Sequence, residues 1–400
     1  MTSPLKTLRR QPGAVWAVAF ASVVSFMGIG LVDPILPSIA KQLNATQTQS
    51  ELLFTTYLAL TGVAMFFTSW VSSRIGTKTT LLIGLALVVA FATACSLAPS
   101  VMPIIGFRAG WGIGNALFVS TALAAMVSAA VGGSASAIIL YETSLGIGFA
   151  IGPLTGGLFG SLTWRAPFAG TATLMAIGIV AVALMLKNGH HAVHKAPVPV
   201  SAPFKALRDP GMGTIGVAAF FYNMAFFTTL AFPPFALARL GCGDAITIGL
   251  VFFGWGGLLA ISAVLVAPRL TAIMRRTSVL IMAEIMLAAV LVACALVANS
   301  ATGIMVCVIL AGIPLGLLNT VLTECSMEAS ELPRPVASST YSGCRFLGGA
   351  IAPPLCTFLA GATSVWVPFV YGAAMILVSA GIIYFRRRAL ARVDCDLTTS

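Results

Sequence analysis

The sequence contains little charge. Only 8% of its 400 residues are charged, whereas soluble globular domains carry about 25%, so an ordinary soluble domain is excluded. It has three histidines, and it lacks both a Gly-rich phosphate loop and a Cys/His spacing that holds metal. We therefore expect no enzymatic activity, no cofactor and no bound metal. The net charge of +11 does not call for a nucleic-acid partner, because the positions of the basic residues explain it.

Long apolar runs make up most of the chain instead. Residues of the hydrophobic set account for 58% of the sequence, and the mean hydropathy is +1.01. A helix that crosses a bilayer needs roughly 20 mostly apolar residues. The runs and their polar interruptions predict an all-α membrane protein with twelve transmembrane helices, at 14–39, 52–72, 79–97, 102–127, 136–160, 167–186, 212–237, 245–268, 277–298, 302–325, 337–359 and 365–385.

The basic residues predict the orientation. If the N-terminus lies in the cytoplasm, most of the 22 basic residues fall in inner loops and tails, and the outer loops hold only Lys41, Arg165 and Arg239. By the positive-inside rule we expect both termini in the cytoplasm. The protein would then be a multi-pass component of a bacterial cytoplasmic membrane, in contact with lipid.

One long connection divides the chain. Residues 187–211 contain four prolines and all three histidines, which is typical of a linker. We expect an N-terminal six-helix bundle over 1–186, a cytoplasmic linker over 187–211, and a C-terminal bundle with a cytoplasmic tail over 212–400. His190, His191 and His194 have no fourth ligand nearby, so a solvated tract is favoured over a metal site.

The two parts repeat each other. A shift of 200 residues lays Tyr141 on Tyr341, Gly148 on Gly348 and Pro153 on Pro353. A shift of 202 lays Gly110 and Gly114 on Gly312 and Gly316. This pattern predicts two pseudo-symmetric six-helix bundles. Six-helix repeats of this kind occur in transporters that bind substrate between the halves, near the middle of the membrane.

Four motifs in the first half then point to a family. They are Met27-Gly28 with Pro34-Ile35-Leu36-Pro37, the stretch Ser73-Arg74-Ile75-Gly76-Thr77-Lys78, Arg108 with Gly112 and Gly114, and the series Gly148, Gly152, Pro153, Gly156 and Gly157. With these motifs and its helix count, the chain resembles the major facilitator superfamily, and within it the twelve-helix drug:proton antiporters. The glycine-proline series is similar to the motif associated with export.

The resemblance implies a secondary active transporter of the multidrug type. It would export amphipathic or lipophilic small molecules in exchange for protons, by alternating access and as a monomer. Arg74, Gly76 and Lys78 would belong to its gating loop. That loop departs from the family pattern, with Ser69 in place of a glycine and Ser73 in place of an aspartate, so the gating latch must differ here.

Two other functions remain open. An exporter of a specific metabolite, such as a siderophore or a sugar, would use Arg345 to bind an anionic or hydroxylated group. A membrane enzyme or receptor that does not move its ligand is the alternative from another class, but such a protein has no need of two repeated bundles.

The small residues of 136–160 also have a direct physical interpretation. Gly148, Gly152 and Gly156 recur every four residues on one helix face, which lets another backbone approach closely. Pro153 removes one helical hydrogen bond. We expect tight packing against a neighbouring helix, with or without pivoting.

Ionisable residues inside the bilayer are the main candidates for function, because each costs about 2.5–3.5 kcal/mol to insert. We expect Asp33 to carry the coupling proton, to form a buried pair with Arg108, or to lie at the interface. Arg108 would tune a carboxylate or bond to carbonyls of other helices. Glu142 would bind a proton or a cationic substrate, or else make a structural bond to 245–268 or to a polar neighbour.

Arg345 would bind an anionic group of the substrate or neutralise Glu324 or Glu142. For Glu284, on a helix expected to be peripheral, a snorkelling or helix-packing role is favoured over proton binding. Polar and aromatic side chains expected to line a substrate cavity, or else to pack, are Tyr57, Asn115, Tyr222, Asn223, Trp255 and Asn319.

Overall fold

A computed structural model describes residues 11–31, 39, 42–131, 133–186 and 198–398. Its described part contains twelve helical spans that are long and apolar enough to cross a membrane, which confirms the predicted fold class. The first six are α2 (Gly13–Gly30), α4 (Gln47–Ile75), α5 (Thr77–Leu97), α6 (Val101–Ala129), α7 (Gly133–Leu162) and α8 (Ala166–Met185). Residues 32–38, which include Asp33 and the prolines of the first motif, lie outside the described part.

The second six spans contain more interruptions. They are α10 (Pro210–Ala231) with α11 (Pro233–Arg239), α12 (Ala245–Ile261) with the π-helix η2 (Ser262–Val266) and α13 (Ala267–Thr271), α14 (Arg276–Leu296), α15 (Ala301–Glu328), α16 (Arg334–Ala362) and α17 (Val367–Phe385). A short helix, α9 (Ala202–Ala206), lies within the predicted linker, and η3 (Arg387–Thr398) follows α17.

Capping residues mark several helix starts. Asp209 accepts from the backbone N–H of Met212 at 2.9 Å and so caps α10, and Asp244 caps α12 through Thr247 at the same distance. Thr46 and Gln49 form a capping box at α4. These side chains satisfy N–H groups that the first helical turn leaves without a partner. Between α4 and α5, Gly76 has a φ of 84°, which a residue with a Cβ rarely adopts.

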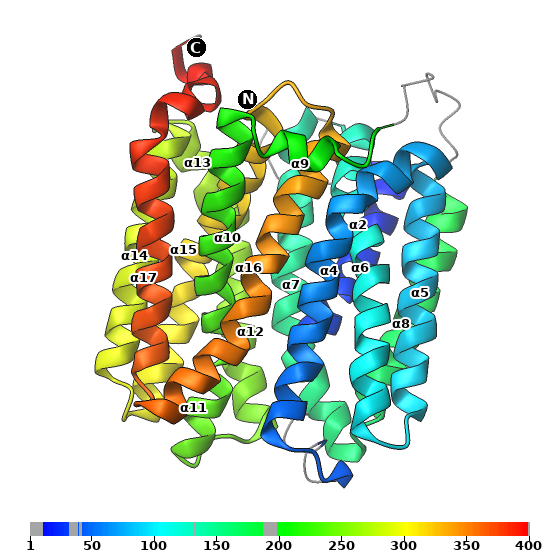
Figure 1. Cartoon of the computed structure of the whole chain (residues 1–400), viewed down its shortest axis with the longest axis vertical. Helices are drawn as coiled ribbons and strands as arrows, with labels where there is room; N and C mark the ends of the chain where they lie inside the picture. Colours follow the sequence, from blue (N-terminus) through cyan, green and yellow to red (C-terminus); the bar gives the residue numbers. More distant parts are fainter. Residues whose placement is uncertain (1–10, 32–38, 40–41, 132, 187–197, 399–400) are drawn as a thin grey trace.

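The helices form two adjacent bundles. Figure 1 shows α2, α4, α5, α6, α7 and α8 on one side and α10 to α17 on the other. The end of α17, η3 and α9 lie at the same end of the molecule, called the termini end below, and α11 lies at the opposite end. The predicted linker therefore leads into a short helix at the termini end, in its described part.

Helix α7 packs closely against α2 of its own bundle. A Cβ added at Gly148, Gly152 or Gly156 would come within 2.6, 2.7 and 2.4 Å of the carbonyl oxygens of Val23, Met27 and Leu31, respectively. The three contacts repeat at intervals of four residues on both helices. The predicted close approach of a second backbone is thus present, and α2 is the helix that uses it.

A second face of α7 contacts the other bundle. A Cβ added at Gly256 of α12 would lie 2.4 Å from the Cβ of Ala150, and one at Gly249 would lie 3.0 Å from the Cα of Leu154. Helix α16 is placed in the same way: Gly348 meets Phe220 of α10, and Gly343 meets the Phe66 ring of α4. The seam between the bundles is therefore formed by α7 with α12 and by α16 with α4.

Candidate functional site

A buried carboxylate bridges the seam between the two bundles. Glu142 of α7 is fully buried, and its Oε1 accepts a hydrogen bond from Thr323 Oγ1 of α15 at 2.7 Å. The same hydroxyl lies 3.4 Å from the hydroxyl of Tyr341 on α16. Glu142 Oε2 has no hydrogen-bond partner among the described residues. The polar neighbour that we expected for Glu142 is thus a threonine of the opposite bundle.

Arg345 anchors the C-terminal side of this cluster. Its Nη2 donates to Asn319 Oδ1 at 2.8 Å, and the Tyr222 hydroxyl donates to the same oxygen at 2.6 Å. The guanidinium also lies over the Tyr341 ring, 5.3 Å from its centroid. The charges of Arg345 and Glu142 act on each other, yet the ion pairs of the described residues include none between them. Arg345 Nε has no described partner.

A small cavity adjoins the cluster. Its volume is about 10 Å³, which is room for about one water molecule. Asn223, Ser342 and Arg345 supply its polar lining, and the rest is apolar, from Phe26, Val119, Tyr141, Leu145, Phe149, Phe226, Phe227 and Phe346. Both bundles contribute to this wall, so the cavity lies on the seam.

The two bundles contact each other on either side of the cavity. On the termini side, Ser338 of α16 donates to the carbonyl of Ser120 on α6 at 2.9 Å. On the other side, the rings of Phe54 and Phe227 meet edge to face with their centroids 6.0 Å apart. The structure therefore holds the bundles in a closed arrangement around the central cluster.

Aromatic rings cross the seam beside the cavity. Phe149 of α7 lies 5.5 Å from Phe226 and 5.9 Å from Trp255, measured between ring centroids. Trp255 is fully buried, and its Nε1 has no described partner. Of the six polar and aromatic side chains expected at a cavity, Asn223 lines this one. Asn319 accepts from the arginine that lines it, Tyr222 donates to Asn319, and Trp255 packs against Phe149 of the wall.

The other two, Tyr57 and Asn115, lie within the N-terminal bundle. The Tyr57 ring lies under Arg108, 4.2 Å from the guanidinium carbon, and Trp111 lies 4.9 Å away. Arg108 donates to the carbonyl of Leu53 at 3.2 Å and to that of Gly28 at 3.4 Å. Asn115 accepts from Ser25 of α2. Arg108 thus bonds to carbonyls of α4 and α2, and its predicted relation to Asp33 falls outside the described residues.

The residues of the loop expected to act in gating make local contacts. Lys78 donates to the carbonyl of Ala183 on α8 at 2.8 Å, and Arg74 lies over the Trp70 ring at 5.0 Å. Ser73, which replaces the family's aspartate, accepts from the backbone N–H of Val198 at 3.1 Å. Beside this loop, a cavity of about 480 Å³ separates α4 and α6 from the start of α16. Ser73 therefore ties the loop to the segment that connects the bundles.

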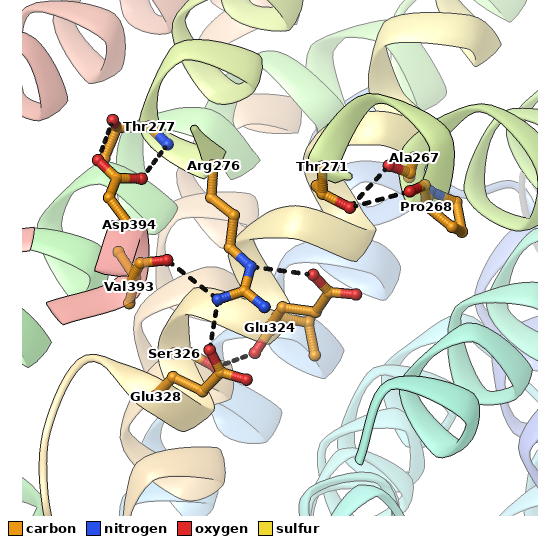
Figure 2. A network of polar contacts seen from close by, with 11 residues as sticks. Ala267, Pro268, Thr271, Arg276, Thr277, Glu324, Ser326, Glu328, Val393 and Asp394 are labelled. Atoms are coloured by element: carbon orange, nitrogen blue, oxygen red, sulfur yellow. Dashed lines mark hydrogen bonds and ion pairs between the residues drawn. The ribbon is translucent and has the colours of Figure 1, made fainter. Parts of the chain in front are cut away.

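A charge network at the termini end of the C-terminal bundle was not predicted. Arg276 lies 3.5 Å from Glu324 and 2.5 Å from Glu328, two residues one turn apart at the end of α15 (Figure 2). Arg276 also donates to the carbonyl of Val393 in η3, at 3.0 Å. The neutralising partner of Glu324 is thus Arg276, not Arg345. The i, i+4 spacing of the two glutamates was the available signal.

The tail joins the same network. Asp394 accepts from both the backbone N–H and the hydroxyl of Thr277, at 3.1 and 2.6 Å (Figure 2). Arg392 pairs with Glu331 at 3.1 Å on the surface. These bonds hold η3 against the start of α14 and the end of α15.

Comparisons with known proteins agree with the fold. The sequence model of the Major Facilitator Superfamily matches residues 18–353. The Multidrug efflux protein YfmO of Bacillus subtilis (strain 168) is 45% identical over 391 residues, covering 96% of each chain. The Putative multidrug resistance protein MdtD of Salmonella typhimurium is 22% identical over 241 residues, 60% of this chain and 49% of that one.

A solved structure shares the architecture. The human organic anion transporter MFSD10 (TETRAN) superposes with a TM-score of 0.79 at 14% identity, covering 93% of this chain and 99% of the other. At this identity the similarity concerns the arrangement of the helices, and it carries no information on cargo.

Proposed function

Since the chain belongs to the Major Facilitator Superfamily, we propose that it exports amphipathic or lipophilic small molecules in exchange for protons by alternating access. It is a multi-pass integral membrane protein with the fold of a transporter. The name of its relative in Bacillus subtilis, which covers nearly the full length, supports multidrug efflux. Membership and fold argue against the membrane enzyme or receptor.

One observation carries the proton part of the proposal: Glu142 is fully buried and bonded across the seam to Thr323. Rocking the bundles apart on this side would break the bond and open the carboxylate to water. Proton uptake or release at Glu142 is then tied to the change between closed and open forms.

The walls of the central cavity suit apolar cargo. Phe149, Phe226 and Phe227 supply ring faces from both bundles, and few polar groups fix an orientation. The present volume of about 10 Å³ is far below the roughly 300–1,000 Å³ of a small-molecule site. Cargo therefore enters a form in which the bundles have separated.

The energy available is sufficient. One proton that moves inward through 100 mV supplies about 2.3 kcal/mol. At a factor of ten per 1.4 kcal/mol, this supports a cargo gradient of roughly 40-fold per proton. We propose that the protein works as a monomer without a cofactor, in a bacterial cytoplasmic membrane with both termini inside.

The test uses dye efflux. Cells that express the protein should expel ethidium and rhodamine 6G, and a protonophore should abolish this efflux. Glu142→Gln and Thr323→Val should each reduce it by about tenfold or more. Thr320→Val is the matched control, because the Thr320 hydroxyl on the same helix has no described partner. Efflux that survives the protonophore, or full activity in Glu142→Gln, would contradict the proposal.

A specific-metabolite exporter is the second candidate, and Arg345 favours it. Arg345 lines the cavity, and a guanidinium can bind an anionic or hydroxylated group through two parallel hydrogen bonds. Such an exporter would expel enterobactin but neither dye, and Arg345→Gln would abolish that activity. A multidrug exporter would expel both dyes and tolerate Arg345→Gln for at least one of them.

A further inference from the structure

Glu284 is a second buried carboxylate, inside the C-terminal bundle and away from the central cavity. It lies on α14, and its side chain is fully buried. Its Oε1 is 2.5 Å from Ser379 Oγ of α17, and that hydroxyl oxygen is 3.0 Å from the carbonyl oxygen of Ala218 on α10. One serine thus connects the carboxyl group to the backbone of a third helix. The complete burial excludes the snorkelling role expected from the sequence.

The hydrogen atoms shared among Glu284, Ser379 and Ala218 can be counted. A serine hydroxyl has one hydrogen to donate, and here it faces two oxygens. If Ser379 donates to Ala218, the 2.5 Å contact requires a hydrogen from the Glu284 carboxyl group. If Glu284 is ionised, Ser379 must donate to it instead and release Ala218. All contacts are satisfied together only when Glu284 carries a proton.

The surroundings offer the ionised form little support. Glu284 Oε2 has no hydrogen-bond partner among the described residues, and Ser379 is the side chain that bonds to the carboxyl group. The nearest cation on its own helix, Arg276, is taken up by Glu324 and Glu328. On α10, Tyr222 is the titratable group on which the charge of Glu284 acts. The charged groups nearest to α10 and α17 in the sequence, Arg208, Asp209 and Arg386, lie beyond the ends of these helices and line the groove described next.

A groove at the termini end passes beside these hydrogen-bonded residues. It lies between α10 and α17 and has a volume of about 620 Å³. Arg208, Asp209 and Arg386 line its outer part, while Val217 and Val378 line its inner part. These two valines directly precede Ala218 and Ser379 in the sequence. The groove therefore comes within one residue of Ala218 and of Ser379 along their helices, although neither of these buried residues lines it.

We propose that Glu284 is a second proton-binding site, which fastens α10 to α14 and α17 when occupied and loosens α10 when empty. The step is a simple ionisation: the carboxyl O–H bond breaks, the proton passes to water, and the Ser379 hydroxyl turns from Ala218 to the carboxylate. Helix α10 carries Tyr222 one turn beyond Ala218, and Tyr222 holds Asn319, which binds Arg345. Occupation of Glu284 is thereby coupled to the central cluster.

The role of this site in transport rests on the proposed function, but its proton does not. In the purified wild-type protein, the infrared C=O band of a protonated carboxyl group should be present at low pH and decline as pH rises. Glu284→Gln should lack that band, and Ser379→Ala should shift its frequency because the hydrogen-bond partner is lost. Glu331→Gln, which changes an exposed glutamate, should leave the band unchanged.

Transport completes the test. In proteoliposomes, Glu284→Gln should retain ethidium exchange without a gradient but lose at least tenfold of the stimulation by a pH gradient. If this variant does not fold, Glu284→Met replaces it as a neutral side chain of similar volume. A band that never titrates, or Glu284 variants with wild-type stimulation, would overturn the inference. If transport by the wild type does not respond to the pH gradient while the band titrates, the proposed function fails. Glu284 is then a proton-binding site without a part in transport, and the coupling is overturned as well.

Discussion

Replacing Gly148 by alanine should separate α7 from α2. The new Cβ would come within 2.6 Å of the carbonyl oxygen of Val23 and 2.9 Å of the backbone nitrogen of Met27. Because both contacts are to backbone, α2 cannot yield by turning a side chain. Overpacking of this kind costs about 1–3 kcal/mol, whereas the change from glycine to alanine in a helix contributes up to about 1 kcal/mol of stability.

A matched variant separates the two effects. Gly106 lies in α6, and no neighbouring atom lies within 4 Å of a Cβ added there. Gly106→Ala should therefore show only the stability gained when alanine replaces glycine in a helix. Gly178→Ala is intermediate, since its Cβ would meet the Ala21 side chain at 3.4 Å. The difference in free energy of unfolding between Gly106→Ala and Gly148→Ala therefore equals the steric cost, about 1–3 kcal/mol.

Thermal unfolding of the purified proteins in detergent measures this order. Gly106→Ala should melt highest, Gly178→Ala close to it, and Gly148→Ala below the wild type. If Gly148→Ala melts as high as Gly106→Ala, then α7 does not approach α2 as closely as described, and the explanation of the glycine series is wrong.

Three further results are expected. Arg276→Ala should lower the free energy of unfolding by up to about 3 kcal/mol, because it leaves Glu324, which is only 10% exposed, without its partner. Arg392→Ala should lower it by less than about 1 kcal/mol, since both members of its ion pair are exposed. Equal melting temperatures of the two variants would refute this ranking. Arg108→Lys should reduce both melting temperature and efflux, because lysine cannot serve the carbonyls of Leu53 and Gly28 while stacking on Tyr57; normal activity would show that one charge suffices. The hydrogen bond from the Thr247 backbone lowers the pKa of Asp244 below its unfolded-state value of 3.8. The stabilisation by this carboxylate is therefore complete above pH 3.8 and is lost as pH falls through the lower folded-state pKa. Asp244→Asn, still a capping residue, should match the wild type at neutral pH and lose less stability in acid, as melting curves across pH can check.

The spans were predictable because apolar length is a local property of the sequence. Their interruptions were less so: the run 212–237 was expected as one helix, whereas α10 ends at Ala231 and α11 begins at Pro233. Two consecutive prolines there remove backbone donors, which ends the regular hydrogen bonding. The close approach of α7 to a second backbone was predicted from glycine spacing, but its partner α2 was not, since spacing shows a face and not what covers it.

The candidate site divides in the same way. The cost of a charge in lipid singled out Glu142 and Arg345 from the sequence alone. Their partners Thr323 and Asn319 leave no comparable signal, because hydroxyl and amide groups are common in helices for many reasons. Arg276 lay just outside the expected span 277–298, whereas α14 begins at this residue, and its pairing with Glu324 was missed. The boundaries 1–186, 187–211 and 212–400 and the proton-coupling roles of Asp33, Arg108 and Glu142 stay predictions.

The two-sided packing of α7 limits which substitutions the protein can accept. Gly148, Gly152 and Gly156 meet main-chain atoms of α2 on one face, and small residues such as Ala150 meet α12 of the other bundle on the next. A larger side chain at the three glycines would therefore meet backbone atoms, which cannot turn away. The rings around the cavity meet other side chains, which can rearrange. We therefore expect variants with a new cargo spectrum to arise at positions such as Phe226 and Phe227. Helix α7, in contrast, should stay unchanged and keep the spacing between α2 and α12 constant.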